Sequence, residues 1–186
     1  MIILGIRPCI KKSGFSWAIL EIEDDKIGMI SNGRVPGSKK SMGERLTEIR
    51  GQLISALSIY EGKEKYGFLE SHYAGTNNEG REKLFEARGM TKQLLFELGF
   101  NIIELSNHAI YECVPGIDKT EMASYIRQKT GIKVLINDSS IMAFALALTG
   151  WELLKKPKEV IKVQEIKVQE INQKGSYKSS FGLKWG

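Results

Sequence analysis

The sequence has little of several residue types, and each shortage excludes a class of protein. Only two cysteines and two histidines occur among 186 residues, too few for a disulfide framework or a Cys/His zinc site. We therefore expect a reduced, cytoplasmic chain. No apolar run approaches the roughly 18 residues of a membrane span, and residues 1–6 lack the flanks of a signal peptide, so we expect no membrane partner.

The charge is concentrated at one end of the chain. Apolar residues are 42% and charged residues 26%, which is ordinary for a globular domain. Residues 1–150 carry 19 Lys and Arg against 18 Asp and Glu, whereas residues 151–186 carry eight Lys against four Glu. The sequence Ile-Lys-Val-Gln-Glu of residues 161–165 is also repeated directly in residues 166–170. We therefore predict one domain over residues 1–155, followed by a basic tail over 156–186 that is disordered, folds back or binds single-stranded nucleic acid.

The pattern of apolar residues predicts a mixed α/β domain. Short β-rich runs predict strands over residues 2–6, 15–22, 27–33, 65–71 and 101–105. Helical spacing and caps, such as Ser41 with Glu44 and Asp118 with Glu121, predict helices over 41–60, 81–98, 118–129 and 139–154. The first three strands have short connections, so we expect an antiparallel meander that continues into strands crossed over by helices.

Five motifs in matching order resemble the RuvC family of Holliday-junction resolvases. Residues 3–9, Ile-Leu-Gly-Ile-Arg-Pro-Cys, are similar to its first-strand motif I-L-G-I-D-P-G, and Glu70 ends the fourth strand as a family glutamate does. Residues 86–89 stand where the family has Q-A-R-G, residues 118–119 resemble a D-K helix start, and residues 143–149 match A-L-A-L-A-L-T. The resemblance covers about residues 2–154 and implies an RNase H-like fold with a mixed five-stranded sheet.

The resemblance also implies a metal site that this sequence does not fully keep. In the family, four acidic residues hold two divalent metals that flank the displaced phosphodiester bond. Arg7 stands at the first-strand position, and an alignment without gaps puts Ser139 and Met142 at the two last-helix positions. A guanidinium stays charged and cannot ligate a cation. We expect Arg7 to pair with Glu70, or else to point into solvent.

Substitute acids are few. Asp138 lies one residue before Ser139, so it is either a ligand recruited by a one-residue slip or the cap of the last helix. The acids of the second strand and its turn are expected at the far end of the sheet or facing solvent. A lone carboxylate such as Glu104 on the fifth strand is expected to be a solvated surface group. His72 follows Glu70 without an evident partner, and His108 is expected to be structural.

Residues for binding survive better than residues for catalysis. Tyr73 falls where family members carry an aromatic side chain that enters the junction centre. The resemblance further implies a homodimer through the helix over residues 81–98. Phosphate contacts need only positive charge within reach. The candidate phosphate contacts are Lys11, Lys12, Lys39, Lys40 and Lys119.

Three functional hypotheses follow from these residues. The first is a protein that binds branched or structured nucleic acid, DNA above all, without cleaving it and without a cofactor. The alternative is a structure-selective endonuclease that uses Mg²⁺ or Mn²⁺ at Glu70 and Asp138. The third is a scaffold for protein interactions, which the near-neutral body favours.

Overall fold

The structure is a computed structural model that describes residues 1–9, 14–36, 41–71, 78–114, 118–132 and 138–156. The side chains of residues 78–80, 119, 138 and 139 are outside that description. Contacts divide the chain into two units, Met1–Glu152 and Leu153–Gly186. The domain boundary expected after residue 155 remains a prediction.

A mixed five-stranded sheet forms the centre of the first unit. Its strands are β1 (Ile2–Arg7), β2 (Phe15–Glu23), β3 (Lys26–Val35), β4 (Lys65–Glu70) and β5 (Asn101–Leu105). They lie in the order β3-β2-β1-β4-β5. The pairs β1–β2 and β2–β3 are antiparallel, whereas β1–β4 and β4–β5 are parallel. The predicted fold class and all five predicted strands are therefore confirmed.

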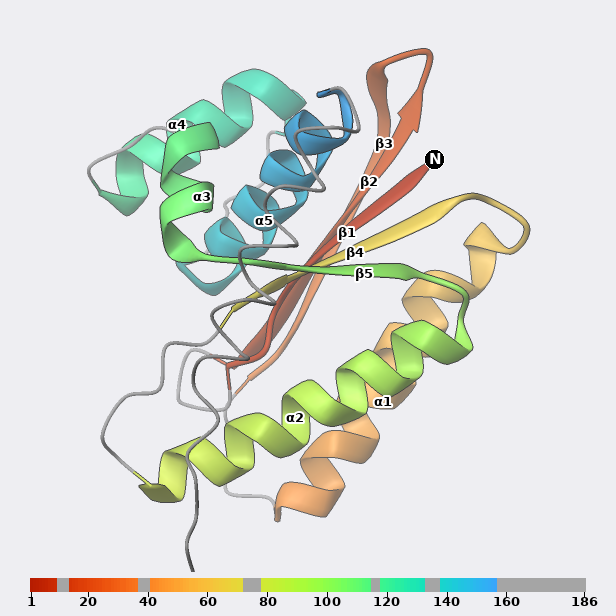
Figure 1. Ribbon diagram of the computed structural model, residues 1–186, viewed down its shortest axis with the longest axis vertical. Helices are drawn as coiled ribbons and strands as arrows, with labels where there is room; N and C mark the ends of the chain where they lie inside the picture. Colours follow the sequence, from red (N-terminus) through yellow and green to blue (C-terminus); the bar gives the residue numbers. More distant parts are fainter. Residues whose placement is uncertain (10–13, 37–40, 72–77, 115–117, 133–137, 157–186) are drawn as a thin grey trace, which may run out of the picture. The chain divides into compact units, whose positions relative to one another are not determined.

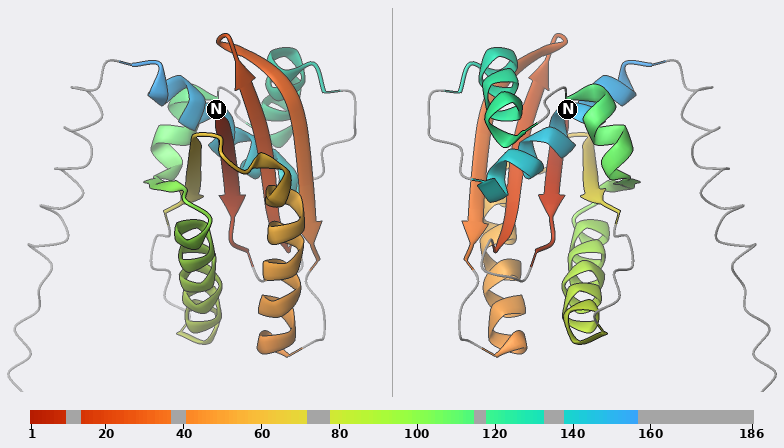
Figure 2. Two further views of the ribbon diagram at one scale, coloured as in Figure 1. Left: turned by 90° about the vertical axis from the view of Figure 1, so that its right-hand side faces the viewer. Right: turned by 90° about the vertical axis from the view of Figure 1, so that its left-hand side faces the viewer.

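Helices cover both faces of the sheet (Figures 1 and 2). Helices α1 (Met42–Leu57) and α2 (Asn78–Glu97) lie side by side on one face, with the short 3₁₀ turn η1 (Ser58–Tyr60) after α1. The other face carries α3 (Asn107–Cys113), α4 (Lys119–Thr130) and α5 (Asp138–Leu154). The sequence did not predict α3. Among the described residues, no helix is long and apolar enough to cross a membrane.

The predicted caps are present and fix where two helices begin. Ser41 and Glu44 form a full capping box at α1, each side chain bonding to the other residue's backbone N–H. The Asp118 side chain accepts hydrogen bonds from the backbone N–H groups of Thr120 and Glu121 at the start of α4. These bonds satisfy backbone donors that a helix N-terminus otherwise leaves without partners.

Alternation along β1 decides which residues face which layer. Ile2, Leu4 and Ile6 belong to the buried cluster that packs against α1 and α2. The residues between them face the α5 side, because successive side chains of a strand point to opposite faces. Helix α5 packs closely against β1 at Gly5, where an added Cβ would lie 2.0 Å from the Ala143 carbonyl oxygen. This backbone contact sets the position of α5 over the sheet.

Candidate functional site

The site lies at the carboxyl ends of β1 and β4. The two strands are parallel and hydrogen-bonded neighbours, with Ile6 paired to Leu69. Arg7 and Glu70 each follow by one residue, so they lie side by side at the same edge of the sheet. Both fall on the face that α5 covers, because Ile6 and Leu69 face the opposite layer. Ligand sites of α/β sheets commonly form at this edge.

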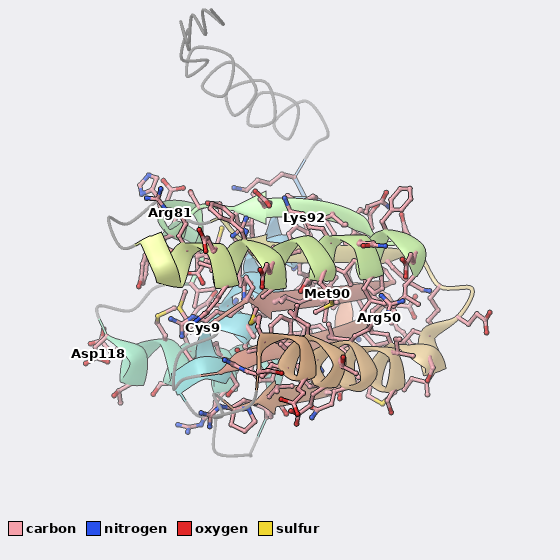
Figure 3. All side chains as sticks on the ribbon, turned by 90° about the horizontal axis from the view of Figure 1, so that it is seen from below. Cys9, Arg50, Arg81, Met90, Lys92 and Asp118 are labelled. Atoms are coloured by element: carbon pink, nitrogen blue, oxygen red, sulfur yellow. The ribbon has the colours of Figure 1, made fainter. Side chains whose placement is uncertain are left out.

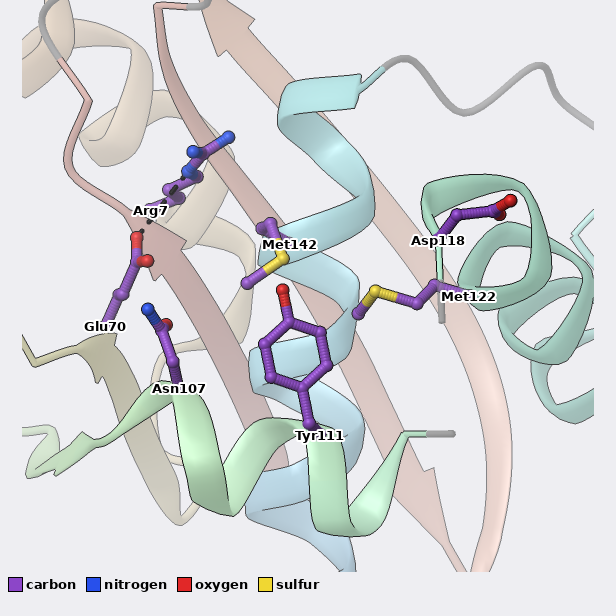
Figure 4. Close-up of a pocket in the computed structure, with 7 residues that line it drawn as sticks. All are labelled: Arg7, Glu70, Asn107, Tyr111, Asp118, Met122 and Met142. Carbon is purple, nitrogen blue, oxygen red and sulfur yellow. Dashed lines mark ion pairs between the residues drawn. The ribbon is translucent and has the colours of Figure 1, made fainter. Parts of the chain in front are cut away.

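Arg7 and Glu70 form an ion pair (Figure 4). The Arg7 Nε atom lies 3.5 Å from Glu70 Oε2, and the side chains are 25% and 22% exposed. The expected pairing of Arg7 with Glu70 is therefore confirmed, and the solvent-facing alternative is wrong. A pair at about 4 Å gains about 4 kcal/mol at an effective dielectric near 20, before the cost of desolvation. A partly exposed pair at the edge of hydrogen-bond reach contributes about 0–1 kcal/mol net, so Glu70 holds Arg7 only weakly.

A pocket of about 220 Å³ opens beside this pair (Figure 4). Its polar end contains Arg7, Glu70 and Asn107, while Met142 of α5 and Met122 of α4 supply thioether walls. The pocket lining comprises Arg7, Glu70, Asn107, Tyr111, Asp118, Met122 and Met142. Five elements or their caps therefore meet at one place, although they are far apart in the sequence.

Two lining residues, Asn107 and Tyr111, escaped prediction because they lie on α3. This helix is seven residues long, and Ile110 is its only residue given as buried. No apolar periodicity could reveal so short a helix. Its one sequence signal is Ser106, whose side chain accepts a hydrogen bond from the Ala109 backbone N–H. His108, which was expected to be structural, is instead 84% exposed on α3.

The start of α5 supplies a methionine where the family resemblance implied an acid. Met142 is 7% exposed and lines the pocket together with Arg7 and Glu70. The alignment without gaps therefore placed this position correctly at the site. Helix α5 begins at Asp138. The side chains of Asp138 and Ser139 are outside the described set, so the ligand and cap readings of Asp138 both remain predictions.

A buried arginine of α2 holds the end of β4 from the other side of the sheet. Arg88, which is 7% exposed, donates to the backbone carbonyl of Glu70 through Nη1 and to the Glu104 carboxylate through Nη2, at 2.7 Å. Lys92 forms a second ion pair with Glu104. The expectation that Glu104 is merely a solvated surface group is therefore wrong. Sequence reasoning missed this pairing because its partners lie on another element.

The Glu104 carboxylate is stabilised in its charged form by these partners. Partial burial acts to raise the pKa of Glu104, because it disfavours the charged carboxylate. The hydrogen bond from Lys92 and the positive charges of Arg88 and Lys92 act in the opposite direction and outweigh burial. The net pKa of Glu104 is therefore below its ordinary value.

The described residues do not fit the two-metal site that the resemblance implied. No group of three or more His, Cys, Asp or Glu residues able to hold a metal occurs among them. Arg7 places a permanent positive charge beside Glu70, and the Asp118 Oδ1 atom already caps α4. Hard divalent cations require several oxygen ligands. The described side chains therefore do not by themselves form a two-metal cage.

The remaining predicted contacts cannot be placed. Tyr73, Lys11, Lys12, Lys39 and Lys40 all lie outside the described residues. The backbone of Lys119 begins α4 beside the pocket-lining Asp118, but its side chain is not described. Their roles in nucleic-acid binding remain predictions.

Comparisons with known proteins agree on one family. The family model described as Crossover junction endodeoxyribonuclease RuvC matches residues 3–150. The curated RuvC endodeoxyribonuclease of Anaplasma marginale (strain Florida) is 28% identical over 155 residues, covering 80% of this chain and 92% of the relative. The corresponding protein of Ehrlichia ruminantium (strain Gardel) is 29% identical over 120 residues, covering 62% of this chain and 72% of its own.

Solved structures show the same fold. A structure of Thermus thermophilus RuvC in complex with a Holliday junction substrate matches with a TM-score of 0.66 and 19% identity, covering 80% of this chain and 91% of the other. A further Thermus thermophilus RuvC structure matches with a TM-score of 0.64 and 20% identity, with coverages of 80% and 92%. The match of the family model to most of the domain, on this RNase H-like sheet, shows that the chain belongs to the RuvC family of crossover junction endodeoxyribonucleases.

Proposed function

We propose that this protein recognises four-way DNA junctions. The family match over residues 3–150 carries this proposal. The similar Thermus thermophilus protein was solved in complex with a Holliday junction substrate, which supports the same class of ligand. Branched DNA is therefore the favoured partner, ahead of a role as a scaffold for other proteins.

Metal-dependent cleavage of the junction is the reading that the comparisons favour over binding alone. Each of the curated relatives described above is named an endodeoxyribonuclease. On this reading Glu70 and Asp138 supply acidic groups, and Mg²⁺ or Mn²⁺ is the cofactor. Since the described residues do not form a metal cage, further oxygen ligands would have to come from elsewhere in the chain or from the DNA.

One observation favours binding without cleavage as a second candidate. Arg7 occupies the first-strand position and is paired with Glu70, the one acid that the resemblance carries over cleanly. A guanidinium can bind a DNA phosphate directly, but it cannot activate water as a bound metal does. On this reading the protein holds junctions without a cofactor.

We also propose a homodimer through α2. Phe85 and Phe96 are 51% and 78% exposed on this helix. Eleven residues separate them, which is close to three full turns, so both lie on one face of α2. Large exposed apolar side chains grouped on one face are typical of an interface with another protein. Sedimentation of the Phe96→Ser variant should show a monomer, and an unchanged dimer would contradict this interface.

A junction assay tests recognition and cleavage separately. The full chain is titrated onto a labelled four-way junction and onto a linear duplex of the same sequence, first in EDTA and then in Mg²⁺ or Mn²⁺. Junction recognition predicts tighter binding to the four-way junction in EDTA, and equal binding to both DNAs would refute it. No binding to any nucleic acid even at low salt, where phosphate contacts are strongest, would favour the scaffold hypothesis.

Three variants then decide between the two candidates. Cleavage that requires a divalent metal and is lost in Glu70→Gln supports the endonuclease reading. Glu23→Gln, at an exposed site at the other end of the sheet, is the matched control and should leave cleavage unchanged. If the wild type does not cut, binding alone is supported, and Arg7→Asp should still fail to cut because Met142 remains at the site.

A further inference from the structure

The pocket beside Arg7 contains hydrogen-bonding groups that lack protein partners. The ion pair between Arg7 and Glu70 is formed at Nε, and the two terminal nitrogens of Arg7 point away from that carboxylate in Figure 4. The Asn107 amide and the Tyr111 hydroxyl point into the same pocket, and neither forms a hydrogen bond with a described side chain or backbone group. Asn107 and Tyr111 are exposed to water, so a ligand in the pocket would exchange those water contacts for its own hydrogen bonds. A pocket with a few convergent polar groups is the usual form of a ligand site.

The remainder of the lining suits a flat ring. Met122 and Met142 are 2% and 7% exposed and present thioethers to the pocket, and Tyr111 presents a half-exposed aromatic ring. Thioethers and aromatic side chains both pack favourably against ring systems. The pocket volume of about 220 Å³ lies below the range of roughly 300–1,000 Å³ typical for drug-sized ligands. A single ring system therefore fits better than a whole nucleotide.

The charges of the lining argue against a phosphate group as the ligand. Glu70 balances the positive charge of Arg7, and Asp118 adds a second carboxylate. An anion beside Arg7 would also meet the Glu70 carboxylate, whereas a neutral ring with acceptors and donors would satisfy both Arg7 and Glu70. Guanine offers O6 and N7 as acceptors for an arginine. Its N1–H and N2–H groups can donate to a carboxylate such as Glu70.

We propose that this pocket binds an unstacked nucleobase of the DNA, with guanine preferred. The source of the base rests on the proposed function, since a branch point places bases at the ends of stacked arms. Taking a base out of a stack requires only a few kcal/mol, and least where pairing is already disturbed. A base bound there would occupy the space where the family resemblance implied metal ions, so this proposal accords with the second candidate, binding without cleavage.

In the first test, guanosine, adenosine and inorganic phosphate are added to the full chain. Saturation-transfer NMR then measures the binding of each nucleoside and its displacement by phosphate. Guanosine should bind more strongly than adenosine, and inorganic phosphate should not displace it. Met142→Trp fills the pocket and should abolish the guanosine signal, whereas Met29→Trp, at an exposed methionine of β3, should keep it. Absence of a guanosine signal, displacement by phosphate, or an unchanged signal in Met142→Trp overturns the proposal. If Met142→Trp does not fold, Tyr111→Ala, a substitution at a half-exposed site, replaces it in the test and should weaken the guanosine signal.

The second test uses four-way junctions in which each branch-point guanine is replaced in turn by an abasic site. One replacement should weaken binding by the wild type by about fivefold or more, the lower range for losing a stacked base. The same replacement should cost Tyr111→Ala little, because the two changes remove one interaction. If the abasic replacement weakens junction binding equally for wild type and Tyr111→Ala, the base-binding proposal is wrong, although junction recognition stands. If the wild type binds guanosine but no junction, the proposed function fails and the pocket stands.

Discussion

Replacing Arg88 by alanine should destabilise the protein much more than replacing Arg50 by alanine, although both arginines form ion pairs of nearly equal length. Arg88 Nη2 lies 2.7 Å from Glu104, and Arg50 Nη2 of α1 lies 2.8 Å from Glu97 of α2. The difference between them is burial, because the Arg88 side chain is 9% exposed and the Arg50 side chain is 42% exposed. Figure 3 labels Arg50 on α1 and, on α2, Lys92, the second partner of Glu104.

The expected magnitudes follow from what each truncation leaves behind. Arg88→Ala removes the donor to the Glu70 carbonyl and leaves Glu104 with Lys92 alone. Breaking a fully buried pair costs about 3–5 kcal/mol. Since Glu104 is 35% exposed and keeps one partner, we expect about 2–3 kcal/mol. The exposed Arg50 pair should contribute about 0–1 kcal/mol.

Urea unfolding and thermal unfolding, both monitored by the fluorescence of the three tryptophans, measure the changes in unfolding free energy and in Tm. At about 2–4 °C per kcal/mol for a chain of this size, Arg88→Ala should lower Tm by about 4–12 °C and Arg50→Ala by less than about 4 °C. The Arg88→Lys variant keeps the charge but not the two-pronged donation, so its stability should lie between Arg88→Ala and wild type. Equal losses for the two alanine variants would show that burial does not determine the strength of these pairs.

Three further predictions concern stability. Gly5→Ala should lower the free energy of unfolding by about 1–3 kcal/mol or more, because the added methyl group overpacks against the Ala143 carbonyl. Gly51→Ala has nothing near its added Cβ and should stabilise α1 by about 0.5–1 kcal/mol. Thermal melts of both variants check the contrast. The pKa of Glu104 is lowered from 4.5 in the folded state, so its contribution is present above pH 4.5 and is lost as the pH falls through the folded value. The stability difference between wild type and Glu104→Gln should therefore shrink in acid, and a constant difference would contradict the assignment. Arg7→Ala should change Tm by no more than about 2–4 °C, because its pair with Glu70 is weak.

Much of the fold could be predicted because its signals are local. The capping box of Ser41 and Glu44 marks the start of α1, and short apolar runs mark every strand of the sheet. Helix α3 could not be predicted, because a seven-residue helix with one buried residue leaves no periodic pattern. The residues that the sequence missed at the pocket, Asn107 and Tyr111, were missed for that reason alone.

The candidate site was predictable where strand register fixes it. The family resemblance placed Arg7 and Glu70 at neighbouring strand ends, and the structure joins them in an ion pair. The partners of Glu104 were not predictable, since Arg88 and Lys92 reach it from α2 and spacing along the chain does not reveal contacts between elements. Whether Asp138 serves the site stays a prediction, because only its backbone is described.

The close contact at Gly5 separates the architecture of this domain from its chemistry. The backbones of β1 and α5 pack against each other there without an intervening side chain, and this contact lies apart from the side chains that line the pocket. An acidic residue at that rim can be replaced by an arginine or a methionine without changing the packing of β1 against α5. Lineages that inherit such a frame can exchange reactive groups for recognition groups one substitution at a time, while remaining fully folded at every step.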